Sequence, residues 1–257
     1  MDVQLEEIQD ILKKYGQEHL LNHYDLLDEK KKQTLLEQIN KIDFELVNNL
    51  YSSTKEQKTN GHDKITPIDY LDKFKLNDQY KYYEGIGKKA IKEGKLAAVT
   101  MAGGQGTRLG HSGPKGTYDI GLDSHKSLFE LLSENLKEEG KKYDVMIPWF
   151  IMTSRENNKD TVEFFEKHKY FGYQKNKNIF FFEQGELPMM DTEGKILIGE
   201  DGLIKLAADG HGGIYESLVK TNMTKKMREL GIEWVFIGGV DNCLVKMVDP
   251  VLMGIAI

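Results

Sequence analysis

Cysteine is nearly absent from this sequence, which has Cys243 and no other among its 257 residues. A lone cysteine cannot form a disulfide within the chain, so we expect a reducing compartment, the cytoplasm. Long apolar runs are missing too, and the opening residues, MDVQLEEI, are acidic and amphipathic, unlike a signal peptide. We therefore expect neither a membrane anchor nor export.

An excess of positive charge is also missing. Lysine and arginine number 35 against 41 aspartates and glutamates, which gives a formal net charge of −6. This balance argues against a general nucleic-acid or membrane-surface partner, because such binding needs a broad basic surface. A hydrophobic content of 39% with 30% charged residues is typical of a globular chain with one large or two smaller domains. The composition sets no oligomeric state.

Glycine, by contrast, is concentrated in one segment. Residues 96–115 read LAAVTMAGGQGTRLGHSGPK. The apolar residues 96–102 predict a buried parallel strand, because helices cover both faces of such strands. The loop that follows has glycines at positions 103, 104, 106, 110 and 113, and glycine lets bare backbone N–H groups approach an anion. Arg108 and Lys115 add a planar fork and a point charge, so the segment indicates a phosphate-binding loop.

Two other nucleotide-loop patterns fail here on spacing. A P-loop ends in glycine-lysine-serine or glycine-lysine-threonine, whereas Lys115 follows Pro114 and precedes Gly116. The dinucleotide fingerprint requires a glycine three residues after its second glycine, but Gly110 comes one residue late, which disfavours a dinucleotide-dependent oxidoreductase. A tight strand-to-helix turn with incidental charges is the plainer alternative, although turns rarely need five glycines.

The chain changes character near residue 95. Before it, apolar residues recur at helical spacing, as Leu35, Leu36 and Ile39 do, whereas strand and helix patterns alternate after it. We predict a helical N-terminal segment over residues 1–94 and a nucleotide-binding α/β catalytic domain over residues 95–257. The alternation predicts an α/β fold with a mixed, mainly parallel sheet and helices on both faces.

Local signals place further elements in the second part. A capping box at Ser127 and Glu130 predicts the start of one helix, and a similar pair at Thr153 and Glu156 predicts the start of another. The remaining expected elements are strands over residues 145–152, 178–183 and 234–240, a hairpin over residues 189–198 and one helix over residues 213–230.

Polar residues and glycines gather where the predicted strands end. Gln184 follows one strand, Asp241 follows the last strand, and residues 208–213 open a predicted helix. Open parallel sheets bind ligands at the carboxyl ends of their strands, and helix N-termini favour anions. We therefore expect these loops and the glycine loop to line one pocket.

Several longer motifs extend this pattern. The glycine loop is followed in order by PWFIMTS, HKYFG, IFFFEQGELP, DGHGGIYESL and VDNCLVKMVDP. Together they resemble the eukaryotic-type UDP-sugar pyrophosphorylase family, most closely its UDP-N-acetylglucosamine (UDP-N-acetylhexosamine) branch, over about residues 95–257. The resemblance implies a Rossmann-like nucleotidyltransferase fold of the glycosyltransferase-A-like type. It also implies a uridylyltransferase, which moves UMP from UTP to a sugar 1-phosphate and gives a UDP-sugar and pyrophosphate.

The resemblance implies roles for individual charged residues. Arg108 and Lys115 would be the catalytic groups, which hold the triphosphate and stabilise the charge passing to pyrophosphate. Asp241 would ligate Mg²⁺, the implied cofactor, which takes few protein carboxylates beside phosphate oxygens and waters. Because the attacking phosphate oxygen is already an anion, the reaction needs no general base. Read alone, an aspartate at a strand end often only starts a turn.

The uridine site is implied in the same way. Gln184 corresponds to the family's uracil-reading glutamine, and a primary amide can match the N–H and carbonyl groups of uracil. Gly210 corresponds to a glycine beside the base, where a side chain would block the approach. Taken alone, Gln184 would more often be an ordinary hydrogen-bonding loop residue. The resemblance also implies that the backbone of four further residues binds UTP, namely Met101, Ala102, Gly103 and Gly104. At position 101, methionine replaces the leucine that is usual in the family, a change that keeps the side-chain volume.

His211 leaves the identity of the sugar open. The N-acetylhexosamine branch usually has asparagine at this position, whereas glucose-type relatives have histidine between glycines. We expect His211 to contact the sugar phosphate or the ribose, with N-acetylglucosamine 1-phosphate as the favoured substrate and glucose 1-phosphate as the alternative. The sequence stops within an apolar run, VLMGIAI, which predicts a truncated C-terminus and adds an inactive UDP-sugar-binding fragment as a further interpretation.

Overall fold

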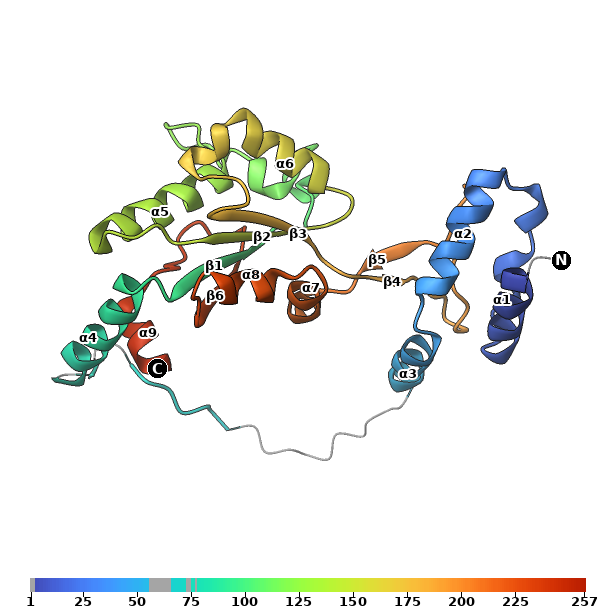
Figure 1. Ribbon diagram of the computed structural model, residues 1–257, viewed down its shortest axis with the longest axis horizontal. Coiled ribbons are helices and arrows are strands. Elements are labelled where there is room, and N and C mark those ends of the chain that lie inside the picture. The colour runs from blue at the N-terminus through green and yellow to red at the C-terminus, as the bar shows by residue number, and fades with distance from the viewer. Residues whose placement is uncertain (1–2, 56–65, 73–74, 77) are drawn as a thin grey trace. The chain divides into compact units, whose positions relative to one another are not determined.

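The computed structural model describes residues 3–55, 66–72, 75–76 and 78–257 (Figure 1). The chain forms two compact units, and neither is one continuous stretch. The N-terminal unit consists of residues 1–67 and 186–209, and the sheet unit consists of residues 68–185 and 210–257. These units divide the chain at other positions than the boundary predicted after residue 94.

The sheet unit is built on four parallel strands. They are β1 (Leu96–Met101), β2 (Trp149–Thr153), β3 (Ile179–Glu183) and β6 (Trp234–Gly239), in the spatial order β3-β2-β1-β6. Because all four run in one direction, their carboxyl ends lie at the same edge. This sheet is wholly parallel rather than mixed, since the antiparallel pair β4 and β5 forms a separate sheet in the N-terminal unit.

Helices cover both faces of this sheet, as the sequence predicted (Figure 1). One face shares a buried cluster with α4 (Asp78–Lys92), α5 (Leu128–Tyr143), α6 (Asn158–Lys167) and α9 (Pro250–Ala256). The other face packs against α7 (Ile214–Lys220) and α8 (Met223–Glu229). Successive strand residues point to opposite faces, so Ala98 and Trp149 are buried on the first face and Ala97 and Phe150 on the second.

The two predicted capping boxes have different outcomes. Ser127 caps α5, and its hydroxyl accepts a hydrogen bond from Glu130 N at 3.2 Å. Thr153 does not open a helix, because it is the last residue of β2, and α6 begins at Asn158. The helix expected over residues 213–230 is also wrong in one respect: it is split into α7 and α8 at Asn222, whose φ of +61° is left-handed.

The N-terminal unit packs three helices against the β4–β5 segment. The helices are α1 (Val3–Lys14), α2 (Glu29–Lys41) and α3 (Phe44–Lys55), and the strands are β4 (Glu186–Pro188) and β5 (Leu206–Ala208). Ile8, Leu35, Ile196 and Ile204 are buried together in its core. The hairpin expected over residues 189–198 is present, since Met190 bridges Ile196 and its turn contains a positive-φ glycine.

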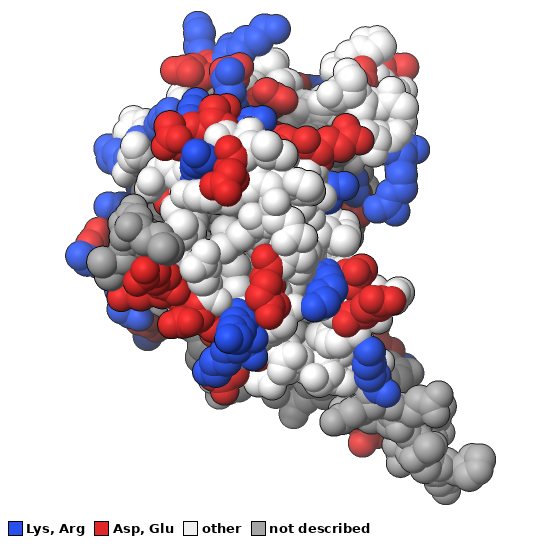
Figure 2. Space-filling view, turned by 90° about the vertical axis from the view of Figure 1, so that its right-hand side faces the viewer, with Lys and Arg blue, Asp and Glu red and all other residues white. Residues whose placement is uncertain are grey.

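In the view of Figure 2, acidic and basic side chains are interspersed with uncharged ones. Within the described ranges, no helix combines the length and apolarity that crossing a bilayer requires.

Candidate nucleotide-binding site

The glycine loop and Gln184 begin side by side at the carboxyl edge of the sheet. Ala102 N donates a hydrogen bond to Met152 O at 2.7 Å, one residue past the end of β1. Gln184 N donates to Thr153 O at 2.8 Å, one residue past the end of β3. Both loops therefore start from positions fixed by β2, the strand that lies between them.

Gly103 and Gln184 lie against each other. A Cβ atom at Gly103 would fall 2.8 Å from Oε1 and 2.9 Å from Nε2 of Gln184, closer than real Cβ contacts come. A side chain at this position would displace the Gln184 carboxamide, the end of a flexible side chain, from the place that it occupies. Both residues remain partly exposed, so the amide can still reach a ligand.

Lys115 joins the glycine loop to the end of β6. Its backbone N–H donates to Gly104 O at 3.0 Å, and its Nζ lies 4.0 Å from Asp241 Oδ2. The Lys115 side chain is 27% exposed and that of Asp241 is 68% exposed. Water screens such a pair, so it adds little to stability, and both charges stay available to a ligand.

The glycine loop is closed by its own contacts. Gly106 N donates to Gly113 O at 2.9 Å, and Gly110 has a φ of +71°. His111 Nε2 lies 2.7 Å from Thr117 Oγ1, and a Cβ at Gly106 would fall 2.8 Å from Cβ of His111. The loop is thus a fixed turn braced by His111, a role that the sequence did not indicate.

Asn157 also belongs to this site, and the sequence analysis missed it. The residue is fully buried after β2, and its Nδ2 donates to Ala102 O at 2.9 Å and to Gly104 O at 3.3 Å. Its Oδ1 accepts a hydrogen bond from Ser154 N at 2.9 Å. An asparagine at the start of a helix suggests only a cap, so no local signal pointed to the glycine loop.

The remaining predicted residues lie near the start of α7 or on the exposed side of the glycine loop. Gly210 has φ +83° and ψ 179°, a conformation that only glycine adopts readily. Ser217 Oγ accepts from Gly185 N at 3.0 Å, which ties α7 to the loop after β3. Arg108 and His211 are exposed, and within the described residues neither forms a hydrogen bond or ion pair with another predicted site residue.

The predicted magnesium ligand Asp241 does not belong to a protein metal cage within the described residues. Among the described residues, no group of three or more histidine, cysteine, aspartate or glutamate side chains could hold a metal ion. A protein cage for a metal is therefore not available there. A single exposed carboxylate at a strand end does fit Mg²⁺ that is bound mainly through phosphate oxygens and water.

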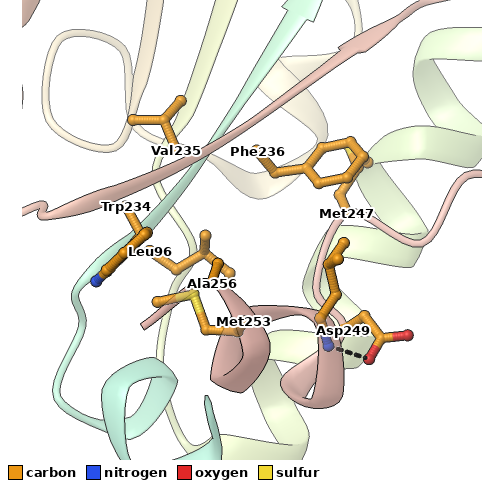
Figure 3. Close-up of a pocket in the computed structure, with 9 residues that line it drawn as sticks. Leu96, Trp234, Val235, Phe236, Met247, Asp249, Met253 and Ala256 are labelled. Carbon is orange, nitrogen blue, oxygen red and sulfur yellow. Dashed lines mark hydrogen bonds between the residues drawn. The ribbon is translucent and has the colours of Figure 1, made fainter. Parts of the chain in front are cut away.

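An apolar pocket in the same unit lies elsewhere (Figure 3). It has a volume of about 180 Å³ and is lined by Leu96, Trp234, Met253 and their neighbours, so it lies where β1 and β6 begin. Its one ionisable side chain, Asp249, accepts a hydrogen bond from Leu252 N at 3.1 Å. An apolar pocket at this end of the strands does not suit a triphosphate.

Comparison with known proteins decides the family. Residues 42–257 match the family described as UTP–glucose-1-phosphate uridylyltransferase. The chain belongs to this uridylyltransferase family. The family resemblance inferred from the sequence is therefore confirmed.

Curated proteins from a plant and a yeast are similar to this chain. The chain is 36% identical over 259 residues to UDP-N-acetylglucosamine diphosphorylase 2 of Arabidopsis thaliana, and the matched region covers 95% of this chain and 51% of the relative. It is 38% identical over 252 residues to UDP-N-acetylglucosamine pyrophosphorylase of Saccharomyces cerevisiae, with 96% and 52% covered. The chain thus spans about half the length of the curated relatives it matches.

Solved structures confirm the predicted nucleotidyltransferase fold. The Trypanosoma brucei UDP-N-acetylglucosamine pyrophosphorylase in complex with inhibitor superposes with a TM-score of 0.79 at 30% identity, covering 100% of this chain and 55% of that one. A UDP-glucose pyrophosphorylase variant from Leishmania major, in complex with UDP-glucose, gives a TM-score of 0.62 at 16% identity, with 91% and 45% covered. The second match is evidence for the fold alone.

Proposed function

We propose that this protein is a uridylyltransferase that transfers UMP from UTP to N-acetylglucosamine 1-phosphate. The products would be UDP-N-acetylglucosamine and pyrophosphate. The observation that carries the proposal is the cluster at the carboxyl edge of the sheet, where Gln184 covers Gly103 and Lys115 faces Asp241. The plant, yeast and trypanosome relatives, 30–38% identical, are named for UDP-N-acetylglucosamine, which supports this sugar over glucose.

Uracil is read by the groups around Gln184 in this proposal. The carboxamide offers one acceptor and two donors, so its oxygen can accept from the N–H of uracil while its NH2 donates to a uracil carbonyl. The base then lies over the backbone of Met101 and Ala102 at the end of β1. Gly210 leaves room beside the base, since no atom of the chain lies within 4 Å of the position that a Cβ would take there.

The transfer itself rests on charge and position. A phosphate oxygen of the sugar 1-phosphate attacks the α-phosphorus of UTP, the bond from that phosphorus to the β-phosphate oxygen breaks, and pyrophosphate leaves. The attacking oxygen is already an anion, so the protein has no proton to remove. Lys115 and Arg108 neutralise the triphosphate and the charge that passes to pyrophosphate. Both side chains can do so because neither is buried.

Asp241 would hold Mg²⁺ together with phosphate oxygens of the nucleotide. The ion, when bound, supplies further positive charge to the crowded phosphates. Lys115 lies 4.0 Å from the same carboxylate, so cationic and anionic protein groups meet the triphosphate at one point. His211, at the start of the α7 region, is the residue we assign to the sugar phosphate or the ribose.

UTP binding is the first test, measured as a shift in melting temperature of the sheet unit. A ligand at one hundred times its Kd stabilises the folded state by about 2.7 kcal/mol. UTP with MgCl2 should therefore raise the melting temperature, whereas NAD should not. Lys115→Ala should weaken UTP binding roughly tenfold, or about 1.4 kcal/mol, through the lost phosphate contact.

Lys126→Ala is the matched control for this test. Lys126 is in the same unit, has a similar exposure of 32%, and pairs with Glu134 at 2.7 Å rather than with a site residue. Its removal should leave UTP affinity unchanged. Stabilisation by NAD instead of UTP, or equal effects of the two lysine substitutions, would reject the nucleotide site.

Pyrophosphate release then tests the reaction and the sugar. The assay supplies UTP with N-acetylglucosamine 1-phosphate in one arm and with glucose 1-phosphate in the other. We expect the larger kcat/KM for the acetylated sugar. A preference for glucose 1-phosphate would favour the alternative activity, and intact UTP binding without turnover in either arm would favour a UDP-sugar-binding protein.

A further inference from the structure

The buried residue Asn157 stands at the N-cap of α6 but does not cap it. Asparagine is favoured at N-caps because its side-chain oxygen accepts a hydrogen bond from the first turn of the helix. Here the side chain forms no such bond. Its carboxamide is used on the Ser154 N–H and on the carbonyls of Ala102 and Gly104 instead. The Oδ1 bond is local, because Ser154 Oγ accepts from Asn157 N at 3.2 Å in return, as in a capping box. The two Nδ2 bonds are the ones that reach another segment, the glycine loop.

Asn157 fixes two peptide planes of the glycine loop. In a trans peptide, the carbonyl of one residue and the N–H of the next point in opposite directions, and the described chain has no cis peptide bond. The Ala102 carbonyl is held toward Asn157, so the N–H of Gly103 points away from it. The Gly104 carbonyl accepts from Asn157 Nδ2 at 3.3 Å and from Lys115 N at 3.0 Å, so the N–H of Gln105 is turned away from both donors. Within the described residues, neither N–H donates a hydrogen bond to the chain.

We propose that Asn157 is a positioning residue, which presents the N–H groups of Gly103 and Gln105 to acceptor oxygens of the bound uridine nucleotide. This inference rests on the proposed UTP binding. Without the Asn157 bonds, the peptide at the start of the glycine loop would have to be oriented when the nucleotide arrives, and that ordering costs binding free energy. With these bonds, the donors are in place before binding.

The chemistry of the amide explains why asparagine is needed. Its oxygen must accept from Ser154 N while its nitrogen donates to two carbonyls. An aspartate of the same size keeps the acceptor but sets a second oxygen against both carbonyl oxygens. When its carboxyl is protonated, however, it can donate to one of them. Burial raises the pKa of a carboxyl, so this protonated form is accessible in mild acid.

The test measures UTP affinity by calorimetric titration at pH 8.5 and pH 6, with MgCl2 present. Asn157→Asp should bind UTP about tenfold more weakly than wild type at pH 8.5, which is the loss expected for a hydrogen bond to a charged group. At pH 6, the loss of UTP affinity that Asn157→Asp causes, relative to wild type at the same pH, should be smaller. Asn157→Ala should show a similar defect at both pH values. A residue that only supported the fold would not give this pH-dependent recovery.

Asn158→Asp is the matched control, since it makes the same chemical change one residue later. Asn158 Oδ1 accepts from Thr153 Oγ1 at 2.8 Å, and a carboxylate keeps that acceptor. Its UTP affinity should stay at the wild-type value. Circular dichroism and tryptophan emission establish whether each variant is folded. If Asn157→Asp does not fold, the UTP affinity of Asn157→Ala tests the positioning role instead.

Folded Asn157 variants with wild-type UTP affinity would overturn the inference. If Lys115→Ala weakens binding while both Asn157 substitutions do not, the inference alone fails and the proposed function stands. If the wild-type chain does not bind UTP, the proposed function fails and the positioning role with it.

Discussion

Helices α4 and α9 cross so closely that their backbones touch, which makes a sharp prediction. A Cβ at Gly87 of α4 would lie 1.8 Å from the carbonyl oxygen of Pro250 in α9. The contact is reciprocal, because a Cβ at Gly254 would lie 1.8 Å from the carbonyl oxygen of Tyr83. Gly85, two residues before Gly87, has no atom within 4 Å of its Cβ position. One helix thus offers a test position and its control.

The expected effects have opposite signs. Ordinary Cβ contacts begin near 3.4 Å, so Gly87→Ala would push α9 away by roughly 1.6 Å. Overpacking of this kind costs about 1–3 kcal/mol, and separation would also expose Val251 and Met253, which are 1% and 6% exposed. We expect a loss of at least about 2 kcal/mol. Gly85→Ala should instead gain nearly 1 kcal/mol, because alanine is the better helix former.

Tryptophan fluorescence provides the assay. The sequence has two tryptophans, Trp149 and Trp234, and both belong to the sheet unit. Thermal unfolding followed by their emission therefore reports on that unit and not on the N-terminal one. For a unit of this size, 1 kcal/mol shifts the melting temperature by about 2–4 °C. Gly85→Ala should raise the midpoint by about 3 °C and Gly87→Ala should lower it by about 6 °C or more.

Equal midpoints for the two alanine variants would refute this reasoning. So would a Gly87→Ala protein that is more stable than wild type, since helix propensity alone would then account for both positions. Gly254→Ala provides an independent check from the other helix, and it should be as damaging as Gly87→Ala because its neighbour is also backbone.

Three further substitutions test the site and the core. Gly103→Ala should weaken UTP binding about tenfold in calorimetric titration, because the new Cβ takes the space of the Gln184 carboxamide, and unchanged affinity would contradict the contact. His211→Asn should change the ratio of kcat/KM for N-acetylglucosamine 1-phosphate over glucose 1-phosphate, and an unmoved ratio would remove His211 from the sugar site. Tyr173→Phe should leave the free energy of unfolding at neutral pH unchanged or raise it by about 1 kcal/mol, because the buried Tyr173 hydroxyl has no hydrogen-bond partner among the described residues. Denaturant titration measures this free energy, and a clear loss would show that the hydroxyl has a partner. Burial also raises the pKa of Tyr173 above its ordinary value of 10.0, so the folded state keeps the phenol proton after the unfolded chain has lost it. The stability of the wild type should therefore fall as pH rises above 10.0, and the stability of the phenylalanine variant should fall less. Melting curves at pH 9 and pH 11 measure both losses, and equal losses would contradict the prediction.

Local sequence signals predicted the sheet and the cluster at its carboxyl edge. The strands at residues 96–101 and 149–153 are apolar except for one threonine each, and nearly continuous apolar runs of this length are typical of a parallel sheet covered on both faces. Gln184 and Asp241 follow strands of that sheet, so the topology brings their loops to one edge without further information. The Ser127 cap is likewise local, since donor and acceptor lie three residues apart.

Contacts between distant segments could not be predicted in this way. The pair Thr153 and Glu156 has the spacing of a cap, but pairing of Thr153 with β3 keeps it in the sheet. The hydrogen bonds from Asn157 to the glycine loop join residues more than fifty positions apart, and sequence periodicity carries no record of them. The same holds for residues 186–209, which leave the sheet unit to complete the N-terminal core.

That detour of the chain affects how the protein can be made. The helices α1 to α3 are synthesised before β1, β2 and β3, yet Ile196 and Ile204, which fill the core of those helices, follow only after these strands. Domains generally fold in the order in which they leave the ribosome. Here the apolar faces of α1 to α3 stay uncovered while most of the sheet unit is synthesised. At that stage, chaperone binding or aggregation competes with folding of the nascent chain.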